Sequence, residues 1–498
     1  MTRLTVAVIG YLSLISPAVS QQIFDVFTTT WDRSSLFTYS TPSPVIDFVT
    51  PGTAASADIV VNDKQVYQTV YGFGATLTDS SAKLLSQLKS KNADNYWSLL
   101  GYLFDPTDGK ESAGITYLRV PIGASDFSDT VYSFDDVSGD TSLKSFNINN
   151  APSYVFSTLT DILGLNSIIH VHLVPWSPPA WMKGSKTMKG GSLSTSNIDA
   201  YANYLLKSLQ GFKNKGVNAW GISIQNEPEN SDTSYPSCNM PVSTEAGVAT
   251  SLRTLMNNNG FSSVKIVGYE HNWIDAGAYP EQLMASAGSD FAGVSFHCYQ
   301  GAVSDQNTFH SAYSNKEIYE TECTGQMGTD WWGDIKWYTN QLFIGAVTNN
   351  AAVAAMWNLA LDSSGGPVLP GSDSCKTACR GVITINSDGT WVPNQEFYAI
   401  AQASRAILPK DSGGPFGKRI GVTVNGGMNW ALVVGAYRTG RVSSSAWPRY
   451  SLVVLNWDDS SSTTFKPVPV KATIEFQGKQ ATYTFPVGVT TLWWYASS

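Results

Sequence analysis

The chain has 498 residues and a formal net charge of −8, and only 14% of its residues are charged. This acidic, weakly charged composition argues against a nucleic acid or an anionic membrane as a partner, because both bind basic surfaces. The length is sufficient for one large barrel and a smaller module.

The first 20 residues have the pattern of a signal peptide. A positive charge at Arg3 precedes the apolar run Leu4–Ile15, and the small residues Ala18 and Ser20 follow. The run is too short for a membrane span, and no later segment offers about 18 uninterrupted apolar residues. We therefore expect residues 1–20 to be cleaved off, and the mature protein to be secreted, extracellular and without a membrane partner.

Between residues 67 and 408, short apolar runs alternate with helix-like segments such as 199–215. Strands that alternate with helices in this way predict an α/β fold, the (β/α)8 or TIM barrel. A doubly wound sheet would show the same alternation, but no glycine-rich phosphate loop follows any of the strands. The predicted strands are Gly72–Thr78, Ile115–Ile122, Ile168–Pro175, Ala219–Gln225, Val264–Tyr269, Gly293–Tyr299, Glu317–Cys323 and Ala351–Leu361.

After about residue 408 the pattern changes to alternating apolar and polar residues separated by turn residues. This period of two over residues 409–498 predicts an antiparallel β-sandwich. The segment 21–66 precedes the first barrel strand and is also β-prone, so we expect it to pair with the C-terminal strands in one appended module.

The chain contains five cysteines, and none of them shows paired C-x-x-C spacing. Zinc and redox sites are therefore not favoured, whereas one or two disulfides are consistent with an extracellular protein. Cys375 could pair with Cys379, and Cys298 could pair with Cys323. The sequence does not choose between these pairs, and the odd number leaves at least one free thiol.

Two glutamates stand where a barrel enzyme carries its catalytic groups, at the carboxyl ends of strands. Glu227 follows the fourth predicted strand and Glu322 lies at the end of the seventh. Two carboxylates that flank a glycosidic bond can divide the hydrolysis: one protonates the leaving oxygen, and the other attacks the anomeric carbon. We expect Glu227 to be the acid/base, a role that needs a raised pKa, and Glu322 to be the ionised nucleophile. In a retaining pair the carboxyl groups lie about 5–5.5 Å apart.

Glu320 is the alternative nucleophile, because side chains two residues apart share one side of a strand. It would lie one layer deeper in the barrel, where a carboxylate needs a partner such as Arg119. Arg119 could instead neutralise and orient Glu322, or form only a structural ion pair. His170 and His172 alternate along the third strand, but no third metal ligand is evident, so we interpret them as core residues.

Other polar and aromatic residues at the strand ends are expected to contact the sugar or to position the catalytic pair. Flat aromatic rings suit the apolar faces of sugars, and an asparagine next to the acid can donate to the 2-hydroxyl. We expect no metal and no cofactor. The predicted substrate-binding residues are Arg119, Asp126, Trp176, Asn226, His271, His297, Tyr299 and Trp357.

The chain resembles glycoside hydrolase family 30 over essentially the whole mature sequence. Within the family it is most similar to fungal endo-β-1,6-glucanases, through residues 118–127, 225–230 and 268–273. The resemblance rests on the motifs Gly72–Ala75 with Thr78-Asp79, Leu118–Pro121, Pro175–Lys183, Gln225–Pro228, His297–Tyr299, Thr321–Cys323 and Trp357–Leu361.

The resemblance implies a barrel joined to a β-sandwich built from both chain ends, and a retaining mechanism through a covalent glycosyl-enzyme. It assigns the acid/base to Glu227 and the nucleophile to Glu322. The Thr-Glu-Cys sequence at the nucleophile departs from lysosomal relatives, which have an extra residue between glutamate and cysteine. The expected function is cleavage of β-1,6-linkages in β-glucan by a monomer.

Two alternatives stay open at this stage. The same mechanism could act on glucosylceramide, β-1,6-galactan or xylan. The chain could also be a carbohydrate-binding protein without turnover, although a binding protein needs neither an acid nor a nucleophile.

Overall fold

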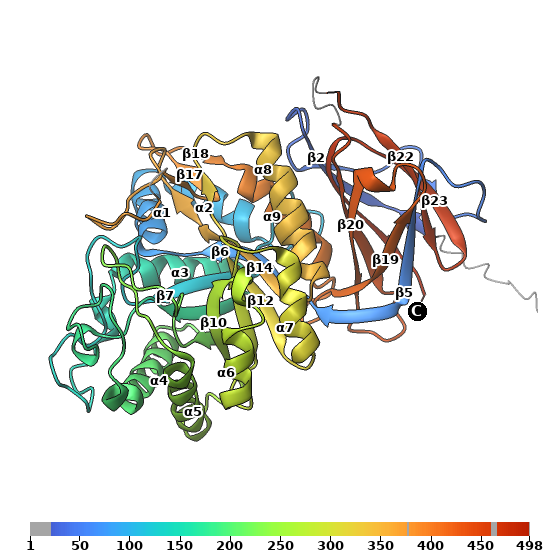
Figure 1. Cartoon of the computed structure of the whole chain (residues 1–498). Coiled ribbons are helices and arrows are strands. Elements are labelled where there is room, and N and C mark those ends of the chain that lie inside the picture. Colours follow the sequence, from blue (N-terminus) through green and yellow to red (C-terminus); the bar gives the residue numbers. More distant parts are fainter. Residues whose placement is uncertain (1–20, 376–377, 460–465, 498) are drawn as a thin grey trace, which may run out of the picture.

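The computed structural model describes residues 21–375, 378–459 and 466–497. The predicted signal peptide, residues 1–20, lies outside the described residues. Eight parallel strands close into a barrel in which each strand pairs with its neighbours in chain order (Figure 1). The predicted (β/α)8 barrel is thereby confirmed. Its strands are β6 (Gly72–Thr76), β7 (Tyr117–Ile122), β8 (His170–Pro175), β9 (Ala219–Ser223), β10 (Lys265–Asn272), β11 (Gly293–His297), β12 (Glu317–Glu322) and β14 (Ala351–Asn358).

Helices connect the barrel strands and cover the outside of the barrel (Figure 1). The first one begins with a side-chain cap, because the Thr78 hydroxyl accepts a hydrogen bond from the Ser81 backbone N–H. The helices are α1 (Asp79–Lys91), α2 (Ala93–Phe104), α3 (Ser153–Leu165), α4 (Ile198–Asn214), α5 (Val242–Asn258), α6 (Tyr279–Ala287), α7 (Gln306–Ala312), α8 (Trp331–Trp337), its π-helical continuation η6 (Tyr338–Ala346) and α9 (Gln395–Ile407).

The barrel interior is packed with side chains rather than hollow. Close approach of strands requires glycine at Gly74, where a Cβ atom would lie 1.8 Å from the Tyr117 carbonyl oxygen. The buried residues that fill the interior are Tyr117, Val267, Tyr319, Ala352, Val353 and Ala355.

Three barrel strands carry an extra residue close to their carboxyl ends. Glu270 in β10, Thr321 in β12 and Trp357 in β14 each interrupt the register with a neighbouring strand. Such bulges re-aim the side chains around them and break the alternation of inward and outward positions. The three bulges therefore change which side chains reach the space above the barrel.

The appended module is one curled sheet of nine strands from both ends of the chain. The predicted pairing of the N-terminal segment with the C-terminal strands is confirmed, since β2 pairs with β24 and β5 pairs with β19. One pair, β5 with β22, is parallel, so the sheet is mixed rather than purely antiparallel. The strands are β2 (Asp25–Thr30), β3 (Thr38–Ser40), β5 (Ala57–Thr69), β19 (Lys418–Asn425), β20 (Leu432–Thr439), β21 (Arg449–Asn456), β22 (Val470–Phe476), β23 (Lys479–Phe485) and β24 (Gly488–Tyr495).

Helix α9 joins the two parts of the molecule. Every residue of α9 is buried, because the helix contacts β6 of the barrel on one side and β2, β21 and β24 of the module on the other (Figure 1). Barrel and module therefore share a packed interface. Within the described residues, no helix is both long and apolar enough to cross a membrane. Short strands complete the fold: β1 (Gln22–Ile23), β4 (Ile46–Asp47), β13 (Gly325–Gln326), β15 (Ala360–Leu361), β16 (Cys379–Arg380), β17 (Ile383–Ile385) and β18 (Trp391–Pro393).

Candidate active site

A cavity of about 450 Å³ lies at the carboxyl ends of the barrel strands. Seven of the ten predicted site residues line it, and two more, Arg119 and His297, contact those residues from below. The lining consists of Asp126, Trp176, Asn226, Glu227, Tyr235, Tyr299, Glu322, Thr324, Gln326, Trp357, Asp373, Ser374, Cys375 and Cys379.

The two predicted catalytic carboxylates face each other in this cavity. One carboxylate oxygen of Glu227, one of Glu322 and a ring nitrogen of His297 all lie within 4.8 Å of one another. Glu227 is held in a left-handed backbone conformation, with a φ of 47°, and its N–H donates to the Glu270 carbonyl at 3.0 Å. A non-glycine residue keeps such a conformation only when its surroundings impose it. The fold therefore fixes the separation of the two carboxylates.

Glu322 is fixed by partners on two sides. Nη1 of Arg119 donates to Oε2 of Glu322 at 2.5 Å, and the Tyr299 hydroxyl donates to Oε1 at 2.9 Å. The Glu322 side chain is 8% exposed and that of Arg119 is fully buried. Charge-assisted hydrogen bonds in a buried setting hold a carboxylate in one orientation.

Glu270 is a buried carboxylate of this site that the sequence analysis missed. It accepts hydrogen bonds from Arg119 at 3.0 Å, from Thr321 at 2.7 Å and from Ser223 at 2.5 Å. Burial alone would raise its pKa, but the Arg119 charge and the hydrogen bond from His297 hold the pKa well below its ordinary value. The position of Glu270 directly after the predicted apolar strand Val264–Tyr269 could have indicated it as a site residue.

His297 bridges the carboxylates. Its Nδ1 lies 3.2 Å from Oε1 of Glu227, and its Nε2 lies 3.3 Å from Oε2 of Glu270. Burial opposes a charged imidazole, but the Glu322 carboxylate and the hydrogen bonds to Glu227 and Glu270 raise the pKa of His297 to about 10. The ring therefore carries two protons at neutral pH and donates from both nitrogens.

The pKa of Glu227 differs from what the acid role led us to expect. Burial raises it, but the hydrogen bond from His297, the charges of His297 and His271, and the Asn230 amide together lower it to about 2. Glu227 and His297 interact strongly enough to titrate as a pair. The proton that the pair shares at neutral pH rests on Nδ1 of His297, one hydrogen bond away from Glu227.

Two stacked tryptophans form one wall of the cavity. The ring centroids of Trp176 and Trp357 are 4.9 Å apart, and the Arg119 guanidinium lies 4.7 Å from the Trp176 centroid. Asp126 accepts a hydrogen bond from the Ser374 hydroxyl at 2.5 Å, while its Oδ1 has no partner within the protein. Aromatic faces next to an unsatisfied carboxylate oxygen match the apolar faces and the hydroxyls of a sugar.

Glu320 does not lie beneath Glu322 as the alternation of the strand predicted. Its Oε2 accepts from the Trp273 indole N–H at 2.8 Å, and Arg119 is not its partner. The prediction was wrong because Thr321 is the extra residue of a bulge, so that Thr321 faces Glu270 while Glu322 faces Arg119 and the cavity. Burial raises the pKa of Glu320 well above its ordinary value.

The remaining histidines lie outside the cavity. Nδ1 of His271 lies 3.8 Å from Oε2 of Glu229, and His271 does not line the cavity. Nδ1 of His172 bonds to the Tyr117 hydroxyl at 2.6 Å and its Nε2 to Ser223 at 2.8 Å, as expected of a core residue.

Both of the possible disulfides are present. Cys298–Cys323 joins the residues that directly follow His297 and Glu322, so it ties together the ends of β11 and β12. Cys375 and Cys379, which both line the cavity, form the other disulfide. Cys238 is a buried free thiol.

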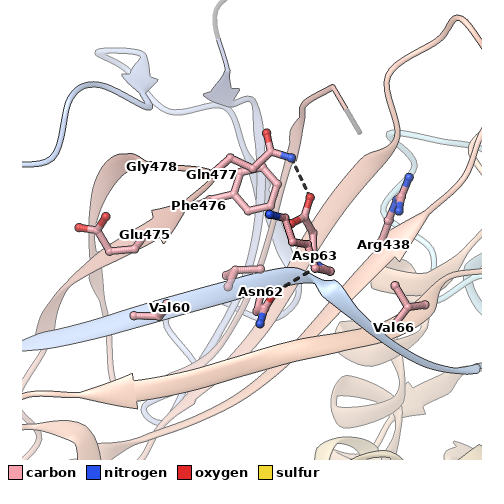
Figure 2. A pocket seen from close by; sticks show the side chains of 11 residues that line it. Val60, Asn62, Asp63, Val66, Arg438, Glu475, Phe476, Gln477 and Gly478 are labelled. Atoms are coloured by element: carbon pink, nitrogen blue, oxygen red, sulfur yellow. Dashed lines mark hydrogen bonds between the residues drawn. The ribbon is translucent and has the colours of Figure 1, made fainter.

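A wider hollow, of about 1030 Å³, lies on the module and not at the barrel (Figure 2). It is bounded by residues 60–66 of β5 and by the turn at residues 475–478. Its Asp63 carboxylate accepts from the Gln477 amide at 2.7 Å and from the Tyr450 hydroxyl at 3.3 Å. This carboxylate holds strand and turn together, so the paired carboxylates at the barrel, rather than the larger volume, mark the candidate active site.

Comparison with protein families gives a match over residues 70–407 to the glycosyl hydrolase family 30 TIM-barrel domain. The chain belongs to glycosyl hydrolase family 30. Its enzyme class is therefore that of the glycoside hydrolases, and its substrate class is carbohydrate.

Curated relatives and a solved structure agree with this family. The endo-1,6-beta-D-glucanase of Neurospora crassa is 31% identical over 408 residues, which cover 79% of this chain and 81% of the relative. Endo-1,6-beta-D-glucanase BGN16.3 of Trichoderma harzianum is 32% identical over 358 residues, 68% of this chain and 69% of the relative. The solved structure of the endo-beta1,6-glucanase BT3312 is 26% identical with a TM-score of 0.80, over 95% of this chain and 99% of that one.

Proposed function

We propose that this family 30 chain is a secreted, retaining endo-β-1,6-glucanase with Glu227 as the acid/base and Glu322 as the nucleophile. The observation that carries the proposal is the pair of carboxylates facing one cavity, with oxygens within 4.8 Å of each other. This short separation supports a direct attack by the second carboxylate, since an inverting enzyme needs room for a water molecule between the pair.

Glu322 has the environment that a nucleophile requires. Arg119 and Tyr299 donate to its two oxygens, so the carboxylate is held in one orientation at the cavity. When Glu322 forms an ester with the anomeric carbon, its charge is lost and the Arg119 charge is still balanced by Glu270. Arg119 and Tyr299 then favour release of the Glu322 carboxylate in the second step.

The proton that Glu227 donates is supplied within the site. Nδ1 of His297 lies 3.2 Å from Oε1 of Glu227 and carries a proton at neutral pH. We infer that this proton moves to Glu227 and then to the leaving oxygen as the glycosidic bond breaks. In the second step Glu227 takes a proton from the attacking water, and the pair regains its original state.

The substrate proposal rests on the relatives. Two fungal relatives named endo-1,6-beta-D-glucanase match about 70–80% of this chain. A net charge of −8 suits a neutral polysaccharide, which needs no electrostatic attraction. Export to the extracellular space is supported by two disulfides among the described residues. We also propose that the protein is a monomer.

Product analysis tests the proposal directly. The purified protein is incubated with linear β-1,6-glucan, β-1,3-glucan, β-1,6-galactan, xylan and glucosylceramide. Release of β-1,6-linked gluco-oligosaccharides from the first substrate alone is the expected result, and a β-configured product at the earliest times, observed by NMR, supports retention. Activity only on a different substrate would overturn the proposed specificity for β-1,6-glucan. No activity on any of the substrates would favour a carbohydrate-binding protein.

A further inference from the structure

A second cleft with aromatic walls lies where the start of α8 meets the module. Its volume is about 460 Å³. Three tryptophans form its walls, and two cations and two carboxylates complete it. These residues are Trp31, Arg33, Asp330, Trp331, Trp332, Lys336 and Asp459.

The two cations of this cleft lie over two of its indole rings, and the Lys336 Nζ is 5.5 Å from the Trp332 ring centroid. The Trp332 indole N–H donates to Asp459 Oδ2 at 2.8 Å, and Lys336 pairs with the same oxygen. The Arg33 guanidinium lies 5.0 Å from the Trp331 ring centroid, and Arg33 has a φ of 62° that few non-glycine residues adopt. The polar groups are therefore arranged around the indole rings.

This composition matches an uncharged sugar better than an ion. The two cations and two carboxylates of the lining balance each other in charge. Aromatic walls suit the apolar faces of a pyranose, while the flanking charged groups offer donors and acceptors for its hydroxyls. Trp331 and Trp332 are largely buried, at 9% and 6% exposure, and lie beneath Arg33 and Lys336, so the partly exposed Trp31 at the rim offers the aromatic surface for a sugar ring.

The cleft lies at the catalytic end of the barrel. Helix α8 follows β12, and a helix that follows a barrel strand begins on the face that carries the active site. Gln326 lines the catalytic cavity and Asp330 lines the second cleft, so their Cα atoms, four residues apart, are at most about 14 Å from each other. A chain of a few sugar units spans such a distance.

The link between the two sites is held in place by Arg380. Its Nη1 donates to the Gln326 carbonyl at 2.6 Å, and its Nη2 donates to Asp334 in α8 at 2.6 Å. The same side chain pairs with the buried Glu396 of α9 at 2.7 Å. The edge of the catalytic cavity and the start of α8 are thus fixed relative to each other.

We propose that this tryptophan cleft binds a further stretch of the polysaccharide chain whose linkage is cleaved at Glu227 and Glu322. The inference rests on the proposed function and adds to it an extended binding surface for long substrates. Removing Trp31 should weaken the binding of polymer and leave the cleavage of short substrates unchanged, because a short substrate occupies the catalytic cavity alone. If the tryptophans serve only to pack the barrel against the module, short and long substrates would be affected alike.

The test compares Trp31→Ala and Arg33→Ala with the wild type and with Trp430→Ala, a control in which an exposed module tryptophan outside the cleft is removed. KM and kcat are measured on polymeric β-1,6-glucan and on an aryl glycoside of β-1,6-linked glucobiose. We expect Trp31→Ala to raise KM for the polymer about three- to tenfold, the range of one aromatic contact, with the aryl glycoside unaffected. Arg33→Ala should act in the same direction, and thermal unfolding reports whether each variant is folded.

The outcomes separate the two proposals. A wild type that cleaves neither substrate overturns the proposed function itself. The second outcome is a wild type that cleaves both substrates. If the Trp31→Ala and Arg33→Ala variants then fold and show an unchanged KM for the polymer, the proposal for the cleft is overturned and the proposed function stands. Binding of the inactive Glu322→Gln protein to insoluble β-1,6-glucan gives an independent measurement. Adding the Trp31→Ala change to this protein should reduce the bound fraction, whereas adding the Trp430→Ala change should not.

Discussion

Arg119 and Glu322 form an ion pair across the barrel, with 2.5 Å between Nη1 of the arginine and Oε2 of the glutamate. The same guanidinium pairs with Glu270 at 3.0 Å and donates to the Asn226 side chain at 2.6 Å. One cation from β7 therefore positions the proposed nucleophile Glu322 and the residue next to the proposed acid, and it pairs with a third carboxylate, Glu270.

Replacing Glu322 by alanine should abolish turnover and leave the fold intact, because its carboxylate would form the glycosyl ester. Added azide should restore activity and give a glycosyl azide of inverted configuration. Glu320→Gln is the matched control: Glu320 is buried and does not line the cavity, so its amide variant should keep near wild-type activity. Azide rescue of Glu320→Ala in place of Glu322→Ala would assign the nucleophile to the other residue.

Glu227→Ala should slow the cleavage of substrates with poor leaving groups by about 10²–10⁴-fold, the usual contribution of a positioned acid. Aryl glycosides with good leaving groups need little protonation, so their first step should be affected far less. Rates of glycosylation on a series of aryl glycosides, measured before the steady state, give the comparison. Equal losses across the series would contradict the acid role.

His297→Asn should move the alkaline limb of the kcat profile to lower pH. In the wild type the Glu227–His297 pair keeps its shared proton up to a pKa of about 10, whereas Glu227 alone would lose it earlier. A purely structural role for His297 would lower kcat without moving this limb. The measurement is kcat on β-1,6-gluco-oligosaccharide between pH 4 and 10, with circular dichroism as the control for folding.

Arg119→Met should destabilise the protein by about 3–5 kcal/mol, because it removes the buried cation that pairs with both Glu270 and Glu322 and leaves His297 to balance them. The double variant Arg119→Met/Glu270→Gln should be less destabilised than the sum of the two single variants, since the uncompensated charge is then removed. Urea unfolding of the four proteins measures this coupling. Strictly additive changes in the free energy of unfolding would show that the pair is not coupled.

Asp126→Asn should change how stability depends on pH. The unfolded chain ionises Asp126 near pH 3.8, whereas burial raises the pKa to about 7 in the folded protein. The folded state then binds more protons than the unfolded state between these values, so this group lowers stability as the pH rises, by at most roughly 1.4 kcal/mol per pH unit. The asparagine variant removes this loss, and its Tm should rise relative to the wild type from pH 4 to pH 8.

Asp79→Asn is the matched comparison for this prediction. Asp79 is also buried, with a pKa raised to about 7, but it does not line the cavity. Both variants should therefore show the same trend in Tm, whereas only Asp126→Asn should raise KM for the sugar. A raised KM in both variants would mean that the loss reflects a general change of the fold.

The barrel and the proposed catalytic pair could be predicted from the sequence because they depend on local pattern. Buried strands appear in the sequence as short apolar runs. In a parallel barrel, the residues that follow those runs all lie on the same face of the barrel. Glu227 and Glu322 both stand at such positions, which is why their meeting in one cavity could be expected before any coordinates. The pairing of residues 21–66 with the C-terminal strands followed from the same kind of pattern.

The direction of individual side chains was accessible only from the tertiary structure, because bulges break the alternation that a sequence pattern assumes. The extra residue Thr321 sends Glu320 outward, and the extra residue Glu270 became a partner of Arg119. Pairs from distant segments, such as Asp126 with Ser374 and Arg33 with Trp331, leave no local trace. The sequence by itself thus determined the fold, the family and the two carboxylates, while packing between distant segments decided how charge and protons are shared around them.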